Sequence, residues 1–269
     1  MFEFNGRTID FVESGNGPLV LFVPGSFSTP AAWRPIQKQL PNGYRFITTS
    51  VCGYGATEET RSLGDVAITH QTRLVEAVVI HAGGGPVHLV GHSMGGMICF
   101  ATAMEGRVDV SSIAAFEANP LELVRENAGE KFYQAIRNMS DEYEAAYLSG
   151  EEDAARRIID FWGREGDFAA MPQPVRAYCK ATTWSNILDW RAAFNFHARK
   201  ADYATLEIPV LAVRGSECNP VMVNITDALH EAVPNIHTEI INNAGHFLIT
   251  SHPSECAVLL RNFLSNLNN

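Results

Sequence analysis

The chain has 269 residues, 46% of them hydrophobic, and a formal net charge of −10 at pH 7. This length and apolar content predict one large globular domain, or a core domain with an inserted segment. The acidic balance argues against a nucleic-acid partner, because no basic stripe is present to displace the counterions of a polyanion.

The N-terminal part of the chain predicts a hairpin, two buried strands and a helix. Residues 2–15 form two short alternating runs about an Asn-Gly turn, which indicates the hairpin. The run at 18–25 is continuously apolar and ends in glycine, as expected of a buried parallel strand. Residues 44–55 predict another strand that leads into a glycine-rich loop. Over residues 65–82 the apolar side chains recur at helical spacing, and a glycine run then ends the helix.

The rest of the chain alternates strands with helices, apart from one long interruption. The predicted strands are 87–91, 111–117, 208–215 and 237–241, and the predicted helices are 94–106, 221–232 and 253–267. Such alternation is typical of an α/β protein whose central sheet is mostly parallel and is flanked by helices on both faces.

Residues 120–203 form the interruption, with helix-like segments and no clear strand. Thirteen of the chain's 26 aromatic residues lie in this segment. The pattern predicts a helical cap, residues 120–203, inserted into a core made of residues 1–119 and 204–269. Phe161, Trp162, Trp184 and Trp190 could line a pocket under this cap. Aromatic residues at helical spacing more often pack in a core, so none of the four is named as a site residue.

A serine between glycines follows one predicted strand and precedes the next helix. Gly91-His92-Ser93-Met94-Gly95 has the Gly-x-Ser-x-Gly pattern of a nucleophile elbow, in which a sharp turn presents the serine hydroxyl to a substrate. An ordinary turn that happens to contain serine is the alternative. The flanking strand and helix favour a nucleophile, which also requires a histidine base and a carboxylate from elsewhere in the chain.

The chain resembles the α/β-hydrolase superfamily over nearly its whole length. The resemblance rests on "LFVPGSFSTPAAW", "SVCGYGATEE", "HLVGHSMGG", "IPVLAVRGSE" and "NNAGHFLITSHPSECAVLLRNFL", together with the helical segment before the fourth of these. It implies the α/β-hydrolase fold with a cap and a catalytic triad in the order serine, acid, histidine.

The general base is expected to be His246, on the loop between the last predicted strand and the last helix. His252 lies at the start of that helix before Pro253, where a surface position is expected. His92 adjoins the nucleophile, but its side chain leaves the elbow in another direction and is expected to pack. The remaining histidines do not lie at the end of such a loop.

The acid departs from the family's commonest pattern. Most relatives have Asp three residues after the glycine that ends the penultimate strand, but here Gly215 is followed at that spacing by Cys218. A thiol cannot orient an imidazole as a carboxylate does. Glu117, at the tip of the strand after the nucleophile's helix, occupies the position that some haloalkane dehalogenases and esterases use, and it is the favoured acid. Glu217 is the alternative.

Two backbone N–H groups are expected to form the oxyanion hole. One belongs to Met94, at the N-terminus of the helix after the nucleophile. The other belongs to Ser26, in a loop where relatives usually have His-Gly and this chain has Pro24-Gly25. Phe27 would take that role if the register shifted by one. The Ser26 hydroxyl itself is expected to stabilise the turn, and a position facing the pocket is the alternative.

Together these residues predict a serine hydrolase that cleaves small to medium carboxylic esters through an acyl-enzyme, without a cofactor or a metal ion. An apolar cap favours an uncharged, partly hydrophobic ester. Perhydrolysis, haloperoxidase-like activity and carbon–carbon bond hydrolysis use the same triad and stay open as alternatives. A dehalogenase is rejected because its nucleophile is a carboxylate. A non-catalytic receptor for small ligands on the same scaffold is the alternative from another class.

The sequence also gives expectations about location. No apolar run approaches the about 18 residues of a membrane span, and the N-terminal residues do not resemble a secretory signal. The five cysteines are scattered, without a C-x-x-C pair, which argues against a disulfide framework or a zinc site and favours the cytoplasm. Cys52 is expected to be a small buried residue. The oligomeric state stays open.

Overall fold

A computed structural model of the chain, which describes residues 1–267, contains a central seven-stranded sheet in the order β3-β5-β4-β6-β7-β8-β9. The strand β3 is antiparallel to β5, whereas the other neighbouring pairs are parallel. The strands are β1 (Phe2–Phe4), β2 (Arg7–Ile9), β3 (Val12–Gly15), β4 (Leu19–Val23), β5 (Arg45–Thr48), β6 (Val87–His92), β7 (Val110–Phe116), β8 (Val210–Gly215) and β9 (Ile236–Ile241).

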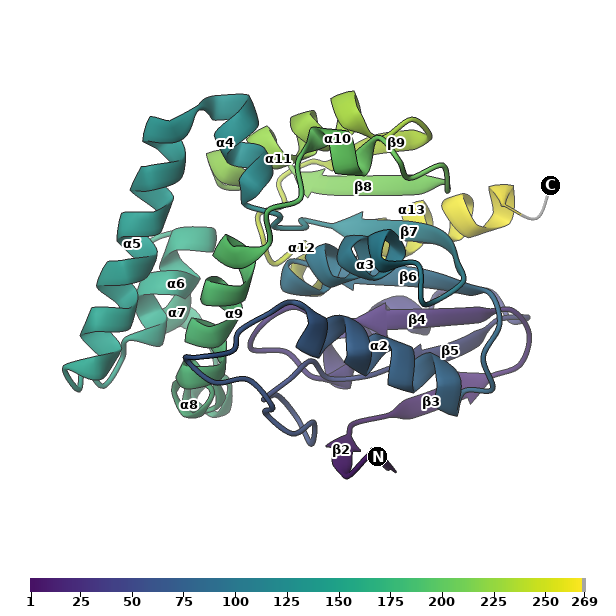
Figure 1. Cartoon of the computed structure of the whole chain (residues 1–269), viewed down its shortest axis with the longest axis horizontal. Coiled ribbons are helices and arrows are strands. Elements are labelled where there is room, and N and C mark those ends of the chain that lie inside the picture. Colours follow the sequence, from purple (N-terminus) through teal and green to yellow (C-terminus); the bar gives the residue numbers. More distant parts are fainter. Residues whose placement is uncertain (268–269) are drawn as a thin grey trace.

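Helices cover both faces of the sheet, and a further group lies at one end of it (Figure 1). The helices of the core are η1 (Pro30–Trp33), α1 (Arg34–Gln37), α2 (Thr69–His81), α3 (Met94–Glu105), α11 (Pro220–Ala232), α12 (Leu248–Ser251) and α13 (Pro253–Asn266). Those between β7 and β8 are α4 (Glu122–Ala128), α5 (Glu130–Leu148), α6 (Ala155–Trp162), α7 (Asp167–Ala170), α8 (Gln173–Ala181), α9 (Thr183–Asn195) and α10 (Lys200–Tyr203). The α/β class and the mostly parallel sheet predicted from the sequence are confirmed.

The apolar core is divided into two layers by the sheet. Successive side chains of a strand point to opposite faces, so Leu21 of β4 joins the layer under α2 and α3, and Phe22 joins the layer under α1 and α13. Both side chains are fully buried. The strand β4, which is covered on both faces, is a continuous run of five buried apolar residues, as expected of a central parallel strand.

The N-terminal hairpin of β1 and β2 lies outside the central sheet. Its two turn residues, Asn5 and Gly6, have φ values of 51° and 75°. Two successive positive φ values are typical of the tight hairpin turns for which Asn-Gly is the preferred pair. The prediction of a hairpin here is confirmed.

The segment between β7 and β8 is helical, as its sequence predicts. In Figure 1, α5 to α9 stand beside the sheet, at the end toward which the parallel strands point. The helices α4 and α10, near the two ends of the segment, pack instead against α11 of the core. The division into a core and a cap at residues 120–203 stays a prediction.

Within residues 1–267, no helix combines the length and the apolar composition needed to cross a lipid bilayer.

Candidate active site

The serine of the Gly-x-Ser-x-Gly pattern occupies a strained turn between β6 and α3. Ser93 has φ 52° and ψ −121°, a sparsely populated backbone conformation that costs a non-glycine residue about 1–3 kcal/mol. Its glycine neighbours are required by space, because a methyl group on Gly91 would lie 2.5 Å from the carbonyl oxygen of Gly95. A methyl group on Gly95 would collide with the carbonyl of Val23 in β4. The elbow is therefore possible only with these small residues.

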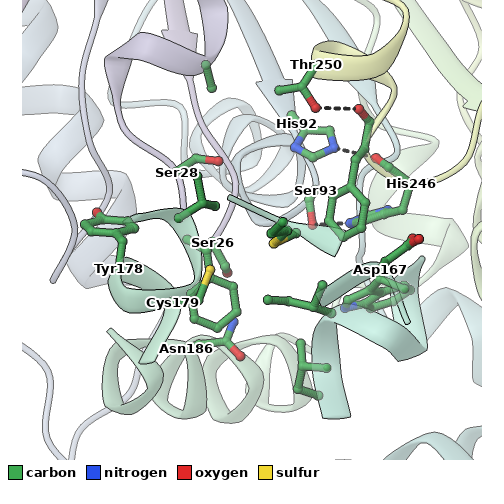
Figure 2. A pocket seen from close by; sticks show the side chains of 18 of the residues that line it. Ser26, Ser28, His92, Ser93, Asp167, Tyr178, Cys179, Asn186, His246 and Thr250 are labelled. Atoms are coloured by element: carbon green, nitrogen blue, oxygen red, sulfur yellow. Dashed lines mark hydrogen bonds between the residues drawn. The ribbon is translucent and has the colours of Figure 1, made fainter. Parts of the chain in front are cut away.

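Three buried side chains from distant parts of the sequence are hydrogen-bonded in series at this turn. His246, which follows β9, places Nε2 3.0 Å from Ser93 Oγ and Nδ1 3.1 Å from Glu117 Oε2. The three residues are only 7%, 3% and 1% exposed for Ser93, His246 and Glu117. Figure 2 shows Ser93 and His246 facing each other at the edge of a cavity. The structure thus brings together the expected nucleophile, base and favoured acid.

The carboxylate of Glu117 is fixed on both oxygens. Glu117 directly follows β7, has a φ of 51° and donates its N–H to Val213 of β8 at 2.8 Å. Its Oε1 accepts the N–H of Gly215 at 2.7 Å, and Oε2 is left for His246. A carboxylate can only accept, so Nδ1 of His246 carries the proton and Nε2 presents a lone pair to the serine hydroxyl.

The alternative acid is placed elsewhere. The carboxylate of Glu217 is partly exposed and pairs with the guanidinium of Arg164, so the structure does not bring it to His246. Cys218, at the family's usual acid position, is half-buried. Burial and the nearby Glu117 carboxylate raise the pKa of its thiol to about 12, and the group is therefore uncharged at neutral pH.

The two expected oxyanion donors flank the nucleophile. Met94 is the first residue of α3, so its N–H has no carbonyl partner within the helix. The loop that contains Ser26 lies against the elbow, since a methyl group on Gly25 would be 3.0 Å from Ser93 Cβ. Phe27, next in the loop, has an unfavourable φ of 58°. The roles of the Met94 and Ser26 N–H groups stay predictions.

The Ser26 hydroxyl does not stabilise its own turn, and the expectation from the sequence is wrong on this point. It donates to Asp189 Oδ2 in α9 at 2.6 Å, a contact between residues 163 positions apart. The same oxygen accepts the Tyr54 hydroxyl at 2.7 Å, and the other carboxylate oxygen accepts Arg61 Nη1 at 2.5 Å. Sequence reasoning missed these residues. The available signal was a single carboxylate in the apolar stretch "NILDWRAAF".

A cavity of about 690 Å³ opens at Ser93 and His246. Of the four aromatic residues that could line a pocket, Trp162 and Trp190 line this cavity. The Trp162 indole stacks on the His246 ring with 4.9 Å between centroids and 21° between planes. Other apolar lining side chains from the segment between β7 and β8 are Ile158, Ile159, Met171 and Val175.

The polar lining of the cavity is mostly uncharged. Among the residues that the structure describes, the lining includes neither lysine nor arginine, and its carboxylates belong to Asp167 and to Asp189, which pairs with Arg61. Asn119 and Asn186 are 9% and 2% exposed and also line it, and the amide oxygen of each is buried without a hydrogen-bond partner. The cavity therefore suits a neutral, largely apolar molecule.

The His92 side chain is hydrogen-bonded to the backbone of the expected base, His246. Its Nε2 lies 2.8 Å from the carbonyl oxygen of His246, and because a carbonyl only accepts, this nitrogen carries the proton. Burial, together with the neighbouring His246, lowers the pKa of His92 to about 3, so the ring is neutral at physiological pH. The packing role expected for His92 thus includes a hydrogen bond that holds the loop of the base.

Comparisons with known proteins agree with this fold. Over 288 residues the chain is 22% identical to monoacylglycerol lipase ABHD6 of Rattus norvegicus, covering 100% of this chain and 80% of that protein. It is 23% identical to 2-(acetamidomethylene)succinate hydrolase of Mesorhizobium japonicum, covering 96% of this chain and 91% of that protein. The solved structure of an alpha/beta hydrolase from Sphaerobacter thermophilus DSM 20745 superposes with a TM-score of 0.73 at 22% identity, covering 97% of each chain. Residues 20–259 match the Alpha/beta hydrolase family, and the chain therefore belongs to that family.

Proposed function

We propose that this α/β-hydrolase is a cofactor-free serine esterase that cleaves neutral carboxylic esters of small to medium size. The observation that carries the proposal is the unbroken hydrogen-bonded series from Glu117 through His246 to Ser93, which ends at the wall of an apolar cavity. A serine hydroxyl becomes a useful nucleophile only when an oriented base takes its proton, and this series provides that base.

The reaction follows from these positions. His246 Nε2 takes the proton of Ser93 Oγ as the oxygen attacks the ester carbonyl, and Glu117 stabilises the imidazolium that forms. The N–H groups of Ser26 and Met94 donate hydrogen bonds to the carbonyl oxygen and stabilise the negative charge that develops on it. The imidazolium then gives its proton to the alcohol oxygen as the carbon–oxygen bond breaks. Water repeats these steps on the acyl-enzyme, which releases the acid and restores Ser93.

The substrate class follows from the cavity. Burying a carboxylate of the substrate without a cationic partner costs free energy. Among the described residues, no lysine or arginine lines the cavity to pair with such a carboxylate. A dicarboxylate, such as the substrate in the name of the Mesorhizobium relative, suits this lining poorly. A monoacylglycerol, named for the rat relative, is a neutral ester and suits it better. The amides of Asn119 and Asn186 can bind one polar group beside the ester.

Further parts of the proposal concern the surroundings of the site. The segment 120–203 acts as a cap that supplies the apolar walls. The five cysteines, all free, favour a reducing compartment, so we propose a cytoplasmic enzyme. Fractionation of the source cells, with the protein detected by antibody, tests this location.

The proposed activity is tested with p-nitrophenyl esters of increasing acyl length. The purified protein is expected to release p-nitrophenol, with the optimum chain length set by the cavity, and Ser93→Ala is expected to abolish release. Circular dichroism should show that the variant is folded. Binding of esters without any turnover would contradict the proposal and favour the alternative of a non-catalytic receptor for small ligands.

A further inference from the structure

A buried cluster of polar side chains connects the helical segment to the loop of the expected oxyanion donor. Asp189 of α9 is 2% exposed, and both of its carboxylate oxygens accept hydrogen bonds. Oδ2 accepts the hydroxyls of Ser26 at 2.6 Å and Tyr54 at 2.7 Å, while Oδ1 accepts Nη1 of Arg61 at 2.5 Å. Burial raises the pKa of the Asp189 carboxyl, while Arg61 and the two hydroxyl donors act in the opposite direction. Three donors around two oxygens favour the ionised carboxylate, whose hydrogen bonds are of the strong charge-assisted kind.

The position of this carboxylate is fixed from its far side. The Arg61 side chain is fully buried, and its Nη2 donates to the carbonyl of Cys52 at 3.0 Å and to that of Ser185 at 3.3 Å. Glu59 completes the set, with 2.7 Å between its Oε2 and Nη2 of Arg61. The cluster therefore joins α9 to the loop after β5 as a rigid unit, with the Ser26 hydroxyl bound at its edge.

The loop at Ser26 needs such a restraint. Phe27 has a φ of 58°, a conformation that a phenylalanine rarely adopts and that a free loop would leave. Gly25 packs directly against Ser93 Cβ, so a small rotation of the loop changes where the Ser26 N–H points. An oxyanion donor acts only when it is directed at the developing charge before the reaction begins.

We propose that Asp189 is a positioning residue for catalysis. Its carboxylate holds the Ser26 hydroxyl and thereby aims the Ser26 N–H at the oxyanion, so the helix that lines the cavity also sets the geometry of the oxyanion hole. This inference rests on the proposed esterase function and extends it from the triad to the helical segment.

The test removes the hydroxyl and keeps the N–H. Ser26→Ala is expected to lower kcat about 10- to 100-fold while KM changes less than about twofold, because only stabilisation of the transition state is lost. Inhibition by a trifluoromethyl ketone, which forms a tetrahedral oxyanion with Ser93, is expected to weaken by a similar factor. A merely structural bond would leave both quantities unchanged in the folded protein.

The chain provides a matched control at Ser50. Like Ser26, it donates its hydroxyl to a carboxylate, Asp10 Oδ2, at 2.8 Å. Ser50 is fully buried whereas Ser26 is half-buried, and Ser50 does not line the cavity. Ser50→Ala should lower the melting temperature as much as Ser26→Ala and leave kcat and inhibitor binding unchanged. Asp189→Asn, if it folds, should lower kcat, and combining it with Ser26→Ala should give less than the product of the two effects.

The outcomes separate the two proposals. An active wild type whose Ser26→Ala variant keeps its kcat and its inhibition constant would overturn the positioning role and leave the esterase function intact. A wild type that neither cleaves esters nor binds the ketone covalently would overturn the esterase function, and the positioning role with it.

Discussion

Replacing Glu117 with glutamine changes one oxygen of the proposed acid to nitrogen at nearly constant shape. The N–H of Gly215 still needs an acceptor and lies 2.7 Å from Oε1, so the amide oxygen takes this place. The amide nitrogen then occupies the position of Oε2, 3.1 Å from His246 Nδ1. An amide N–H can only donate, so Nδ1 must become the acceptor and the imidazole proton moves to Nε2. That nitrogen can no longer accept the proton of Ser93.

The expected effect is large and confined to the chemical step. Holding the wrong tautomer of a triad histidine costs about 10³- to 10⁴-fold in kcat, which is about 4–5.5 kcal/mol in the activation free energy. The melting temperature should change little, because the bond to Gly215 is kept. Steady-state hydrolysis of p-nitrophenyl butyrate measures the loss, and thermal unfolding measures the fold.

The matched control is Glu217→Gln, which removes charge from the partly exposed partner of Arg164. A surface pair of this kind contributes about 0–1 kcal/mol to stability, and kcat should stay within about twofold of the wild type. If Glu117→Gln kept most of the activity while Glu217→Gln lost it, the acid assigned from the geometry would be wrong.

Three further outcomes are expected. Burial holds the pKa of His92 near 3, so below about pH 6.5 the unfolded chain binds a proton that the folded chain does not. The free energy of unfolding therefore decreases as the pH is lowered, by up to about 1.4 kcal/mol per pH unit. Urea unfolding at pH 7 and pH 5 should show a smaller decrease for His92→Gln than for the wild type, and an equal decrease would refute this. Gly25→Ala puts a methyl group 3.0 Å from Ser93 Cβ, and kcat should fall at least about tenfold; unchanged turnover would show that the loop tolerates the shift. Trp162→Leu removes the ring stacked on His246, and kcat should fall about three- to tenfold with Trp162→Phe closer to the wild type; equal rates for the two variants would contradict a role of the stack.

The parts of the site that the sequence predicted depend on neighbouring residues. Ser93 is recognisable because a strand, a Gly-x-Ser-x-Gly turn and a helix follow one another within a few residues. His246 is recognisable by its place after the last strand. Both signals are local, and the structure places both side chains as the local pattern predicts.

The choice of the acid needed information that a single sequence does not contain. Glu117 and Glu217 both follow strands, and only the pairing of β7 with β8 shows which carboxylate reaches the base. That pairing puts Gly215 beside Glu117, and it leaves Glu217 at the surface.

The contact between Ser26 and Asp189 was still harder to predict from the sequence, because it depends on how the helical segment packs on the core. A lone acidic residue in an apolar helix indicates a buried partner but does not identify it. For the same reason Trp162 and Trp190 could not be divided between core and cavity wall from helical spacing alone.

Mapping the site of covalent labelling by a fluorophosphonate tests the central claim most directly, since this reagent phosphonylates a serine only when a base activates it. After digestion, mass spectrometry is expected to find the phosphonyl group on the peptide that contains Ser93, and no labelling in Ser93→Ala. An ester-cleaving protein labelled at another residue, or not labelled at all, would contradict the account.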